Sequence, residues 1–394
     1  MRILIIHNYY QSRGGEDESV DQEVALLRKT GHEVYLYSRH NNEIKNFSLP
    51  RRCLLFLEPT WSQRTFREIK RVIKKFVPDV VHVHNFFPLI SPSVFYACSE
   101  MRVPVIHTLR NYRLLCHTGL LFRKNRICEE CVDCSIWHGL IHRCYHNSYL
   151  QTASISLMLS AHRLMHTWQN KVSLFVASTE FSRAKFVKAG IPEKRIIVRP
   201  NYLLNDPGIG AEKRDGALFI GRLSHEKGLE LLLNAWKELP DLPLTITGDG
   251  PLRPWMENFI SRNNIKQIHI AGFLPADSVF KKLKKALFLV MPSTCYETFG
   301  RVIIEAYACG TPVLASRLGA MAELVQEDKT GLLFKAGGAA DLAKQVRHAL
   351  NNIDNLYKWG RAGRNLFEEK YSGEIAYQRL MDIYTHAASV AKTS

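Results

Sequence analysis

Short apolar segments that alternate with stretches of helical spacing constrain the fold of this 394-residue chain. A segment such as 217–220 (ALFI) is continuously apolar and bounded by glycine, which predicts a strand buried on both faces of a parallel sheet. The predicted strands are residues 2–7, 33–37, 79–84, 103–108, 173–177 and 195–199, followed by 217–221, 243–247, 267–271, 286–291, 312–315 and 331–334.

The segments between these strands carry apolar side chains at helical spacing. Predicted helices lie near 16–30, 64–76, 151–169 and 180–189, and then near 228–238, 251–263, 277–285, 300–309, 320–326 and 339–351. Alternating strands and helices predict parallel sheets that bind ligands at the carboxyl ends of their strands. A chain of 394 residues exceeds one ordinary core, so we expect domains over 1–200 and 201–374, joined by a linker within 201–214.

A basic turn follows the first strand of the second half. Residues 221–228 read GRLSHEKG and lie between a predicted strand and a predicted helix. At such a helix start, unpaired N–H groups and the helix dipole favour an anion, and Arg222 and Lys227 add two positive charges. The turn therefore predicts a phosphate site, although a solvated Arg and Lys on a surface loop would look the same.

Two carboxylates, Glu297 and Glu305, flank the start of a later predicted helix. Both can accept hydrogen bonds from sugar hydroxyls, and the N–H groups of Phe299, Gly300 and Arg301 can face a phosphate. A capping Glu and an exposed Glu would give the same pattern. Together with the basic turn upstream, the pair favours a nucleotide-sugar site.

These motifs resemble glycosyltransferase family 4, retaining enzymes of the GT-B fold. The resemblance spans nearly the whole chain and is carried by Gly14-Gly15-Glu16, by 78–85 (PDVVHVHN), by 221–228, by Gly248-Asp249-Gly250-Pro251, by Glu297-Thr298-Phe299-Gly300 with Glu305-Ala306, and by 310–313 (GTPV). It implies an α/β architecture of two Rossmann-like domains facing a central cleft. The first domain would bind the acceptor, the second the nucleotide-sugar, and a helix within 375–394 would return to the first.

The resemblance also implies roles for individual residues. Arg222 and Lys227 would bind the diphosphate, Glu297 the transferred sugar and Glu305 the ribose hydroxyls. Gly14 and Gly15 would close over the phosphates, and Gly248, Phe299, Gly300 and Arg301 would belong to the donor site. Many relatives carry a histidine near the donor sugar where this chain has Arg110. That arginine could contact an acidic sugar or an acceptor phosphate, or it could hold the loop.

The expected activity is metal-independent transfer of a sugar to a glycan or lipid-linked acceptor, in the synthesis of a cell-surface polysaccharide or glycolipid. No cofactor is expected to take part in catalysis. The alternatives are a nucleotide-sugar epimerase or a phosphorylase on the same scaffold, or a nonenzymatic anion- or nucleic-acid-binding protein. No recognised nucleic-acid module is present, so we expect no nucleic-acid partner.

Positive charge is concentrated in the first half of the chain. Residues 1–200 hold 29 Lys and Arg against 16 Asp and Glu, whereas residues 201–394 hold 24 against 21. The basic half predicts an anionic partner, such as a pyrophosphate-linked lipid or a membrane surface. Residues 64–76 combine an apolar stripe with six basic residues, which fits a helix on anionic lipid and equally a peripheral helix packed on the sheet. No apolar run reaches a membrane-spanning length, so we expect a cytoplasmic protein, with peripheral contact to the inner face of the membrane.

Five of the nine cysteines lie in an expected insertion over about 110–147. Two overlapping C-x-x-C spacings are typical of zinc sites, and Cys116, Cys128, Cys131 and Cys144 would supply the four ligands of a structural zinc ion. Reduced cysteines that merely pack the insertion are the alternative, because the spacing fits no standard zinc finger.

Overall fold

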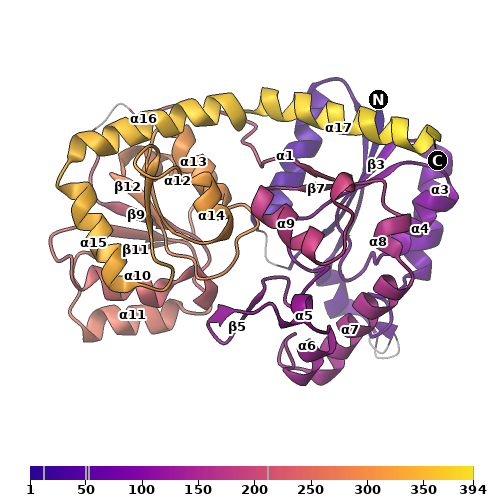
Figure 1. Ribbon diagram of the computed structural model, residues 1–394, viewed down its shortest axis with the longest axis horizontal. Helices are drawn as coiled ribbons and strands as arrows, with labels where there is room; N and C mark the ends of the chain where they lie inside the picture. Colours follow the sequence, from indigo (N-terminus) through magenta and orange to yellow (C-terminus); the bar gives the residue numbers. More distant parts are fainter. Residues whose placement is uncertain (12–13, 49–50, 52–53, 211–212, 394) are drawn as a thin grey trace. The chain divides into compact units, whose positions relative to one another are not determined.

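The computed structural model describes residues 1–11, 14–48, 51, 54–210 and 213–393, apart from the side chains of 390–393. The chain divides into two compact units. Unit 1 comprises the described residues of 1–121, 128–204 and 373–393, and unit 2 comprises those of 122–127 and 205–372. In each unit, helices cover both faces of a twisted sheet (Figure 1).

The sheet of unit 1 has six strands in the order β2-β1-β3-β4-β7-β8, and every neighbouring pair is parallel. Its strands are β1 (Arg2–Tyr9), β2 (Glu33–His40), β3 (Val80–Asn85), β4 (Val105–Thr108), β7 (Leu174–Ala177) and β8 (Ile196–Val198). The strand order reverses between β1 and β3. At such a reversal the connections leave in opposite directions and open a crevice at the carboxyl ends of the strands.

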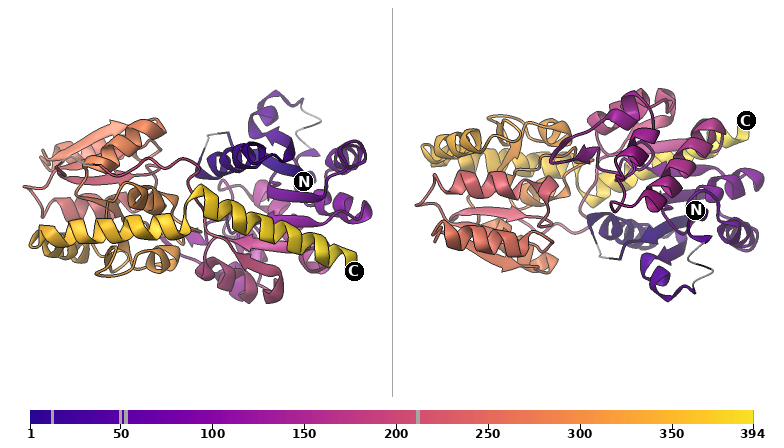
Figure 2. Two further views of the ribbon diagram at one scale, coloured as in Figure 1. Left: turned by 90° about the horizontal axis from the view of Figure 1, so that it is seen from above. Right: turned by 90° about the horizontal axis from the view of Figure 1, so that it is seen from below.

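One face of this sheet is covered by the first and the last helix of the chain. Val20, Val24 and Leu27 of α1 (Gly15–Lys29) join one apolar core with Leu380 and Ile383 of α17 (Gly373–Thr393). Figure 2 shows α17, in yellow, from two further directions. The remaining helices of the unit are α3 (Gln63–Phe76), α4 (Ser93–Glu100), α5 (Glu130–Asp133), α6 (Trp137–Ile141), α7 (Tyr149–Leu164), α8 (Thr167–Asn170) and α9 (Glu180–Lys188).

The sheet of unit 2 also has six parallel strands, in the order β11-β10-β9-β12-β13-β14. They are β9 (Ala217–Ile220), β10 (Leu244–Thr247), β11 (Ile268–Gly272), β12 (Phe288–Met291), β13 (Val313–Ser316) and β14 (Gly331–Phe334). The strand order reverses between β9 and β12, so the crevice predicted for this unit lies beyond the ends of those two strands.

The helices of unit 2 fill both faces of its sheet. One core gathers the apolar residues of α10 (Leu229–Trp236) and α15 (Ala339–Leu350), with Trp236 fully buried. The other helices are α11 (Arg253–Arg262), α12 (Ala276–Lys285), α13 (Arg301–Ala308), α14 (Gly319–Leu324) and α16 (Ile353–Lys370).

Each of the twelve predicted strands is confirmed, but one predicted helix is divided in the structure and several further helices were not predicted. The helix predicted at 151–169 is two helices, α7 and α8, because the chain turns at His166 with a left-handed φ of 50°. Helices α4, α5, α6 and α16 were not predicted. In α16, Gly360 allows close packing, because a Cβ there would lie 2.2 Å from the Gly310 carbonyl oxygen.

No helix among the described residues is both long enough and apolar enough to cross a membrane.

Gly228 fixes the approach of two loops of unit 2, and its replacement tests that contact. Gly228 has a φ of 72°, and an added Cβ would lie 1.9 Å from the Pro292 carbonyl oxygen. We expect Gly228→Ala to lower the free energy of unfolding by more than the roughly 1–2 kcal/mol that a left-handed residue costs. Gly337→Ala is the control, because Gly337 has a φ of 78° and open space around its Cβ position. If urea denaturation shows that both variants lose the same free energy of unfolding, the contact between Gly228 and Pro292 is contradicted.

Candidate functional site

In unit 2, the predicted donor residues follow the two strands that flank the reversal of the sheet. The turn 221–228 follows β9, and the loop 292–300 follows β12. The two segments are hydrogen-bonded, since the Thr294 N–H donates to the Glu226 carbonyl at 2.9 Å. The missing side chain of Gly228 allows this approach. The fold therefore places both segments in the crevice where open parallel sheets bind ligands.

A third glycine-bearing segment, which follows β10, packs against the basic turn 221–228. Gly248, after β10, has a φ of 137°, and a Cβ there would lie 1.9 Å from the Gly221 carbonyl oxygen. Beyond it, the Leu223 N–H donates to the Asp249 carbonyl at 3.0 Å. Gly248 thus holds the basic turn in position through its backbone.

The central contact of this site is an ion pair between Lys227 and Glu297. Lys227 Nζ lies 2.6 Å from Glu297 Oε1, and the Ser293 hydroxyl donates to the same oxygen at 2.8 Å. Burial alone would raise the pKa of Glu297, but the Lys227 charge outweighs it and holds that pKa below its usual value. Burial would likewise lower the pKa of Lys227, and Glu297 instead raises it. Both groups are therefore charged at neutral pH.

The remaining donor candidates lie around this pair. Arg222 is exposed and forms no ion pair within the described part of the chain. Glu305 lies in the second turn of α13, where Arg301 Nε is 3.0 Å from its carboxylate. Gly300 caps α13 with a φ of 90°, and the N–H groups of Phe299 and Gly300 donate to no atom of the described residues. Cationic and N–H donors thus gather at the end of β12 and in the turn after β9.

Gly14, Gly15 and Arg110 belong to unit 1, on the segments that follow β1 and β4. Gly14 caps α1, and a Cβ at Gly14 or Gly15 would meet no atom within 4 Å. Glu16, next in the chain, accepts from the Tyr10 hydroxyl at 3.0 Å and from Asn111 Nδ2 at 3.3 Å. These bonds tie the start of α1 to the segment after β4.

Arg110 is engaged by groups that the sequence did not indicate. Its Nη1 donates to Asn201 Oδ1 at 2.6 Å, and its Nη2 lies 3.3 Å from His84 Nδ1. Arg110 and His84 line a small cavity, partly open to solvent, at the carboxyl ends of β3 and β4. The other lining residues are Asn85, Phe86, Phe87, His107, Thr108, Leu109, Asn111, Arg113 and Leu114.

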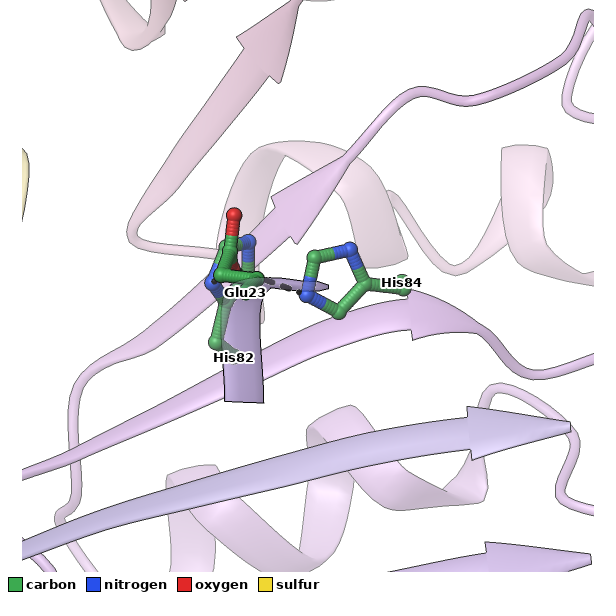
Figure 3. A group of neighbouring side chains, drawn as sticks. All are labelled: Glu23, His82 and His84. Atoms are coloured by element: carbon green, nitrogen blue, oxygen red, sulfur yellow. Dashed lines mark ion pairs between the residues drawn. The ribbon is translucent and has the colours of Figure 1, made fainter. Parts of the chain in front are cut away.

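Beneath this cavity lies a buried group of charged and polar side chains. Glu23 of α1 lies 3.0 Å from His82 Nδ1 and 3.1 Å from His84 Nε2 (Figure 3). The second carboxylate oxygen of Glu23 lies 2.8 Å from Arg199. Burial would raise the pKa of Glu23, but Arg199 and the two histidines hold it well below its usual range. Burial lowers the pKa of His82 and of His84. The group is therefore a carboxylate–guanidinium pair flanked by neutral imidazoles.

A carboxylate and two imidazoles are also metal ligands, but the neighbours of this group disfavour a metal ion. Arginine only donates hydrogen bonds, so Arg110 makes Nδ1 of His84 an acceptor and assigns the ring proton to Nε2, facing Glu23. A protonated nitrogen cannot bind a metal ion, and Arg199 already neutralises the carboxylate. The His82-x-His84 spacing on a strand could have indicated that both rings share one face. Nothing local indicated Glu23 as their partner.

The cysteines Cys116, Cys128, Cys131 and Cys144 all lie in unit 1, on the segment between β4 and α7.

Replacement of Glu23 tests whether this buried pair stabilises unit 1. We expect Glu23→Gln to lower the free energy of unfolding by about 3–5 kcal/mol at pH 7, because the buried Arg199 loses its counter-charge. Because the pKa of Glu23 is depressed by folding, its contribution is complete above the usual value of 4.5 and is lost as the pH falls further. The difference between variant and wild type should therefore narrow below that pH.

Glu33→Gln is the matched control, because Glu33 pairs with Arg2 through largely exposed side chains. We expect it to cost at most about 1 kcal/mol. Equal losses for the two variants, or a pH-independent difference for Glu23→Gln, would contradict the assignment.

Comparisons with known proteins identify the family and the fold of the chain. The family model described as Glycosyltransferase Family 4 matches residues 13–202, and that described as Glycosyl transferases group 1 matches 207–366. The chain is 26% identical over 387 residues to an uncharacterised glycosyltransferase of Methanocaldococcus jannaschii, covering 98% of each chain. Its fold is similar to that of sucrose-phosphate synthase from Thermosynechococcus elongatus, with a TM-score of 0.72, 18% identity and 98% of each chain covered.

HepE of Anabaena, solved in complex with UDP, has a TM-score of 0.68 at 16% identity, covering 98% of this chain and 100% of its own. The two matched family models together span both units, so the chain belongs to the group 1 and family 4 glycosyltransferases, which have the GT-B fold.

Proposed function

We propose that this glycosyltransferase moves a sugar from a nucleotide diphosphate sugar to a glycan or lipid-linked acceptor. It does so with retention of anomeric configuration and without a metal ion. The observation that carries the proposal is the Lys227–Glu297 ion pair at the reversal of the unit 2 sheet. It holds a cation and a sugar-binding carboxylate together at the place where parallel sheets bind nucleotides.

The leaving diphosphate gains negative charge as the glycosidic bond breaks, and fixed positive groups stabilise that charge. Lys227 supplies a point charge, and exposed Arg222 can bind two phosphate oxygens at once. The N–H groups at the start of α13 add donors for the phosphate nearer the sugar. Two cations and a helix terminus supply the charge that a metal ion provides in other enzymes, which supports a metal-independent reaction.

Glu297 positions the sugar in this proposal. Its Oε1 is occupied by Lys227 and Ser293, and its pKa is lowered, so it serves as a hydrogen-bond acceptor for sugar hydroxyls rather than as a proton donor. Glu305, steadied by Arg301, would accept the ribose hydroxyls. No covalent nucleophile is assigned, so the acceptor would attack the face of the sugar that the diphosphate leaves.

The nucleotide and the acceptor are inferred from different observations. The UDP bound to the structural neighbour HepE supports a uridine diphosphate sugar as donor. The cavity of unit 1, with Arg110 and Arg113 in its wall, supports an acceptor that carries an anionic group. A lipid-linked diphosphate has that chemistry, which supports a role in cell-surface glycan or glycolipid synthesis. Phosphate contacts from the backbone of Gly14 and Gly15 stay a prediction of the family resemblance.

Replacement of Lys227 tests the donor site. We expect Lys227→Ala to lower kcat by roughly tenfold or more, because a fixed charge is lost beside the leaving diphosphate. The measurement is sugar transfer or donor hydrolysis with a panel of UDP-, GDP-, ADP- and dTDP-sugars in the absence of added metal. Lys281→Ala, on the exposed face of α12, removes the same charge from the same unit and should leave the rate unchanged. A near-normal rate for Lys227→Ala, with unchanged circular dichroism, would refute the assignment.

Helix α3 is our candidate for contact with an anionic membrane. Its apolar residues Ile69, Ile73 and Phe76 are buried within unit 1, so they are not available for insertion into lipid. Arg67, Arg71 and Lys74 are exposed on the opposite side. Contact with lipid would therefore be electrostatic, with each basic residue contributing about 1 kcal/mol near an anionic surface.

Charge reversal tests this contact. We expect Arg67→Glu, Arg71→Glu and Lys74→Glu together to abolish binding to vesicles that contain anionic lipid and to leave hydrolysis of the donor unchanged. Lys281→Glu, Lys282→Glu and Lys344→Glu reverse as many exposed charges in unit 2 and form the control. If both triple variants bind the vesicles equally well, α3 is not the element that contacts the membrane.

A further inference from the structure

The cysteine-bearing segment of unit 1 is organised around one buried histidine. His117 is fully buried, and its Nε2 lies 2.8 Å from the Ser156 hydroxyl of α7. Its Nδ1 lies 3.8 Å from Cys131 Sγ. Gly139 of α6 packs on the ring so closely that a Cβ there would lie 2.1 Å from Nδ1. The loop after β4 and helices α5, α6 and α7 thus meet at this ring.

Cys116, Cys131 and Cys144 adjoin residues of this packing, and Cys128 lies three positions before Cys131. Cys116 adjoins His117 in the chain, and the Cys144 N–H donates to the Gly139 carbonyl at 3.0 Å. Cys116 and Cys131 are buried, and Cys128 and Cys144 are half-buried. Burial, and then the nearby thiols of Cys116, Cys144 and Cys128, raise the pKa of Cys131 to about 12. Cys131 therefore lies near each of the other three thiols.

The surroundings of these thiols favour a cation over a disulfide. No described cysteine takes part in a disulfide bond. The four thiols belong to one small packed segment, and thiols are soft ligands that can surround one ion. A bound divalent cation would convert its cysteine ligands into thiolates, because metal ligation deprotonates cysteine. The fifth cysteine of the segment, Cys134, is exposed.

We propose that Cys116, Cys128, Cys131 and Cys144 bind one structural Zn²⁺ ion that stabilises the segment between β4 and α7. Tetrahedral zinc holds its sulfur ligands at about 2.3 Å, which sets the sulfur atoms close to 3.8 Å apart. Among the described residues no three of these sulfur atoms lie within 4.8 Å of one another, so binding draws the thiols together. His117 stays outside the ligand set as the packing centre.

The zinc site would also fix the position of Arg113, which lines the unit 1 cavity. Arg113 lines that cavity and donates to the His117 carbonyl. Its guanidinium lies over the rings of Phe87, at 4.6 Å, and Tyr145, at 5.1 Å. His117 and Tyr145 directly follow two of the proposed ligands, Cys116 and Cys144. Loss of the metal would therefore disturb the position of Arg113.

Metal analysis of the full-length protein, purified under reducing conditions, tests the site. We expect about one zinc per chain, almost none in Cys128→Ser, and an unchanged content in Cys134→Ser. Replacement of zinc by cobalt should give the sulfur-to-cobalt charge-transfer absorption of a thiolate site. Far less than one zinc per chain in wild type, full retention in Cys128→Ser, or disulfides among these cysteines would overturn the proposal.

If Cys128→Ser does not fold, variants of Cys144 and chelation of zinc from the wild-type protein test the same site. Cys144→His retains a zinc ligand at that position, so it should bind zinc and cobalt with an altered cobalt spectrum, whereas Cys144→Ser should bind neither. Chelation of wild-type zinc should lower the midpoint of thermal unfolding, and added zinc should restore it. An unchanged cobalt spectrum in Cys144→His would remove Cys144 from the ligand set.

The effect on the cavity can be separated from zinc binding. We expect zinc removal to raise the KM for the acceptor several-fold and to leave donor hydrolysis unchanged. This part rests on the proposed function, whereas the zinc content and the cobalt spectrum do not. An unchanged acceptor KM with zinc fully removed would limit the metal to a structural role away from the cavity.

Discussion

The geometry of the proposed donor site depends on the close approach of two loops in unit 2. Gly228 has no side chain, so the turn after β9 can contact the backbone of Pro292 after β12. That contact brings Lys227 within 2.6 Å of Glu297, although the two residues are 70 positions apart in the sequence. Each charge then compensates the desolvation of the other, so neither has to be neutralised in its partly buried place.

In unit 1, too, buried charges compensate each other next to the reversal of the sheet, although the strand order differs. Its sheet reverses between β1 and β3, and the start of α1 and the segment after β4 are linked there by Glu16 and Asn111. In the core of the unit, Arg199 compensates the charge of Glu23, which also contacts two neutral histidines. Tyr384 of α17 lies 2.8 Å from His82, so the last helix of the chain takes part in this buried group.

The sequence was sufficient to predict the strands, because short apolar runs bounded by turns have few other structures available. It did not predict the break at His166, where a left-handed residue lets Trp168 reach the core. Helix α16 was not predicted, and its glycines serve close packing against α13. The GT-B fold and the family were predicted from motifs and are confirmed by the comparisons.

The sequence predicted some residues of the candidate sites, but it did not predict the contacts that depend on how the loops fold. Motifs indicated Lys227 and Glu297, but Ser293 as a shared partner depends on how one loop folds back on itself. The contacts of Arg110 with His84 and Asn201 join three strand ends, and no local pattern reports such distances. The cysteine spacing indicated neighbouring thiols. The packing of Gly139 on His117, which gathers them, left no trace in the sequence.

The most direct test of the central claim is a crystal structure of the enzyme with a bound nucleotide diphosphate. We expect diphosphate oxygens within hydrogen-bonding distance of Lys227 Nζ and Arg222, and the ribose hydroxyls at Glu305. A diphosphate bound in the unit 1 cavity instead, with Lys227 and Glu297 still paired only to each other, would contradict it.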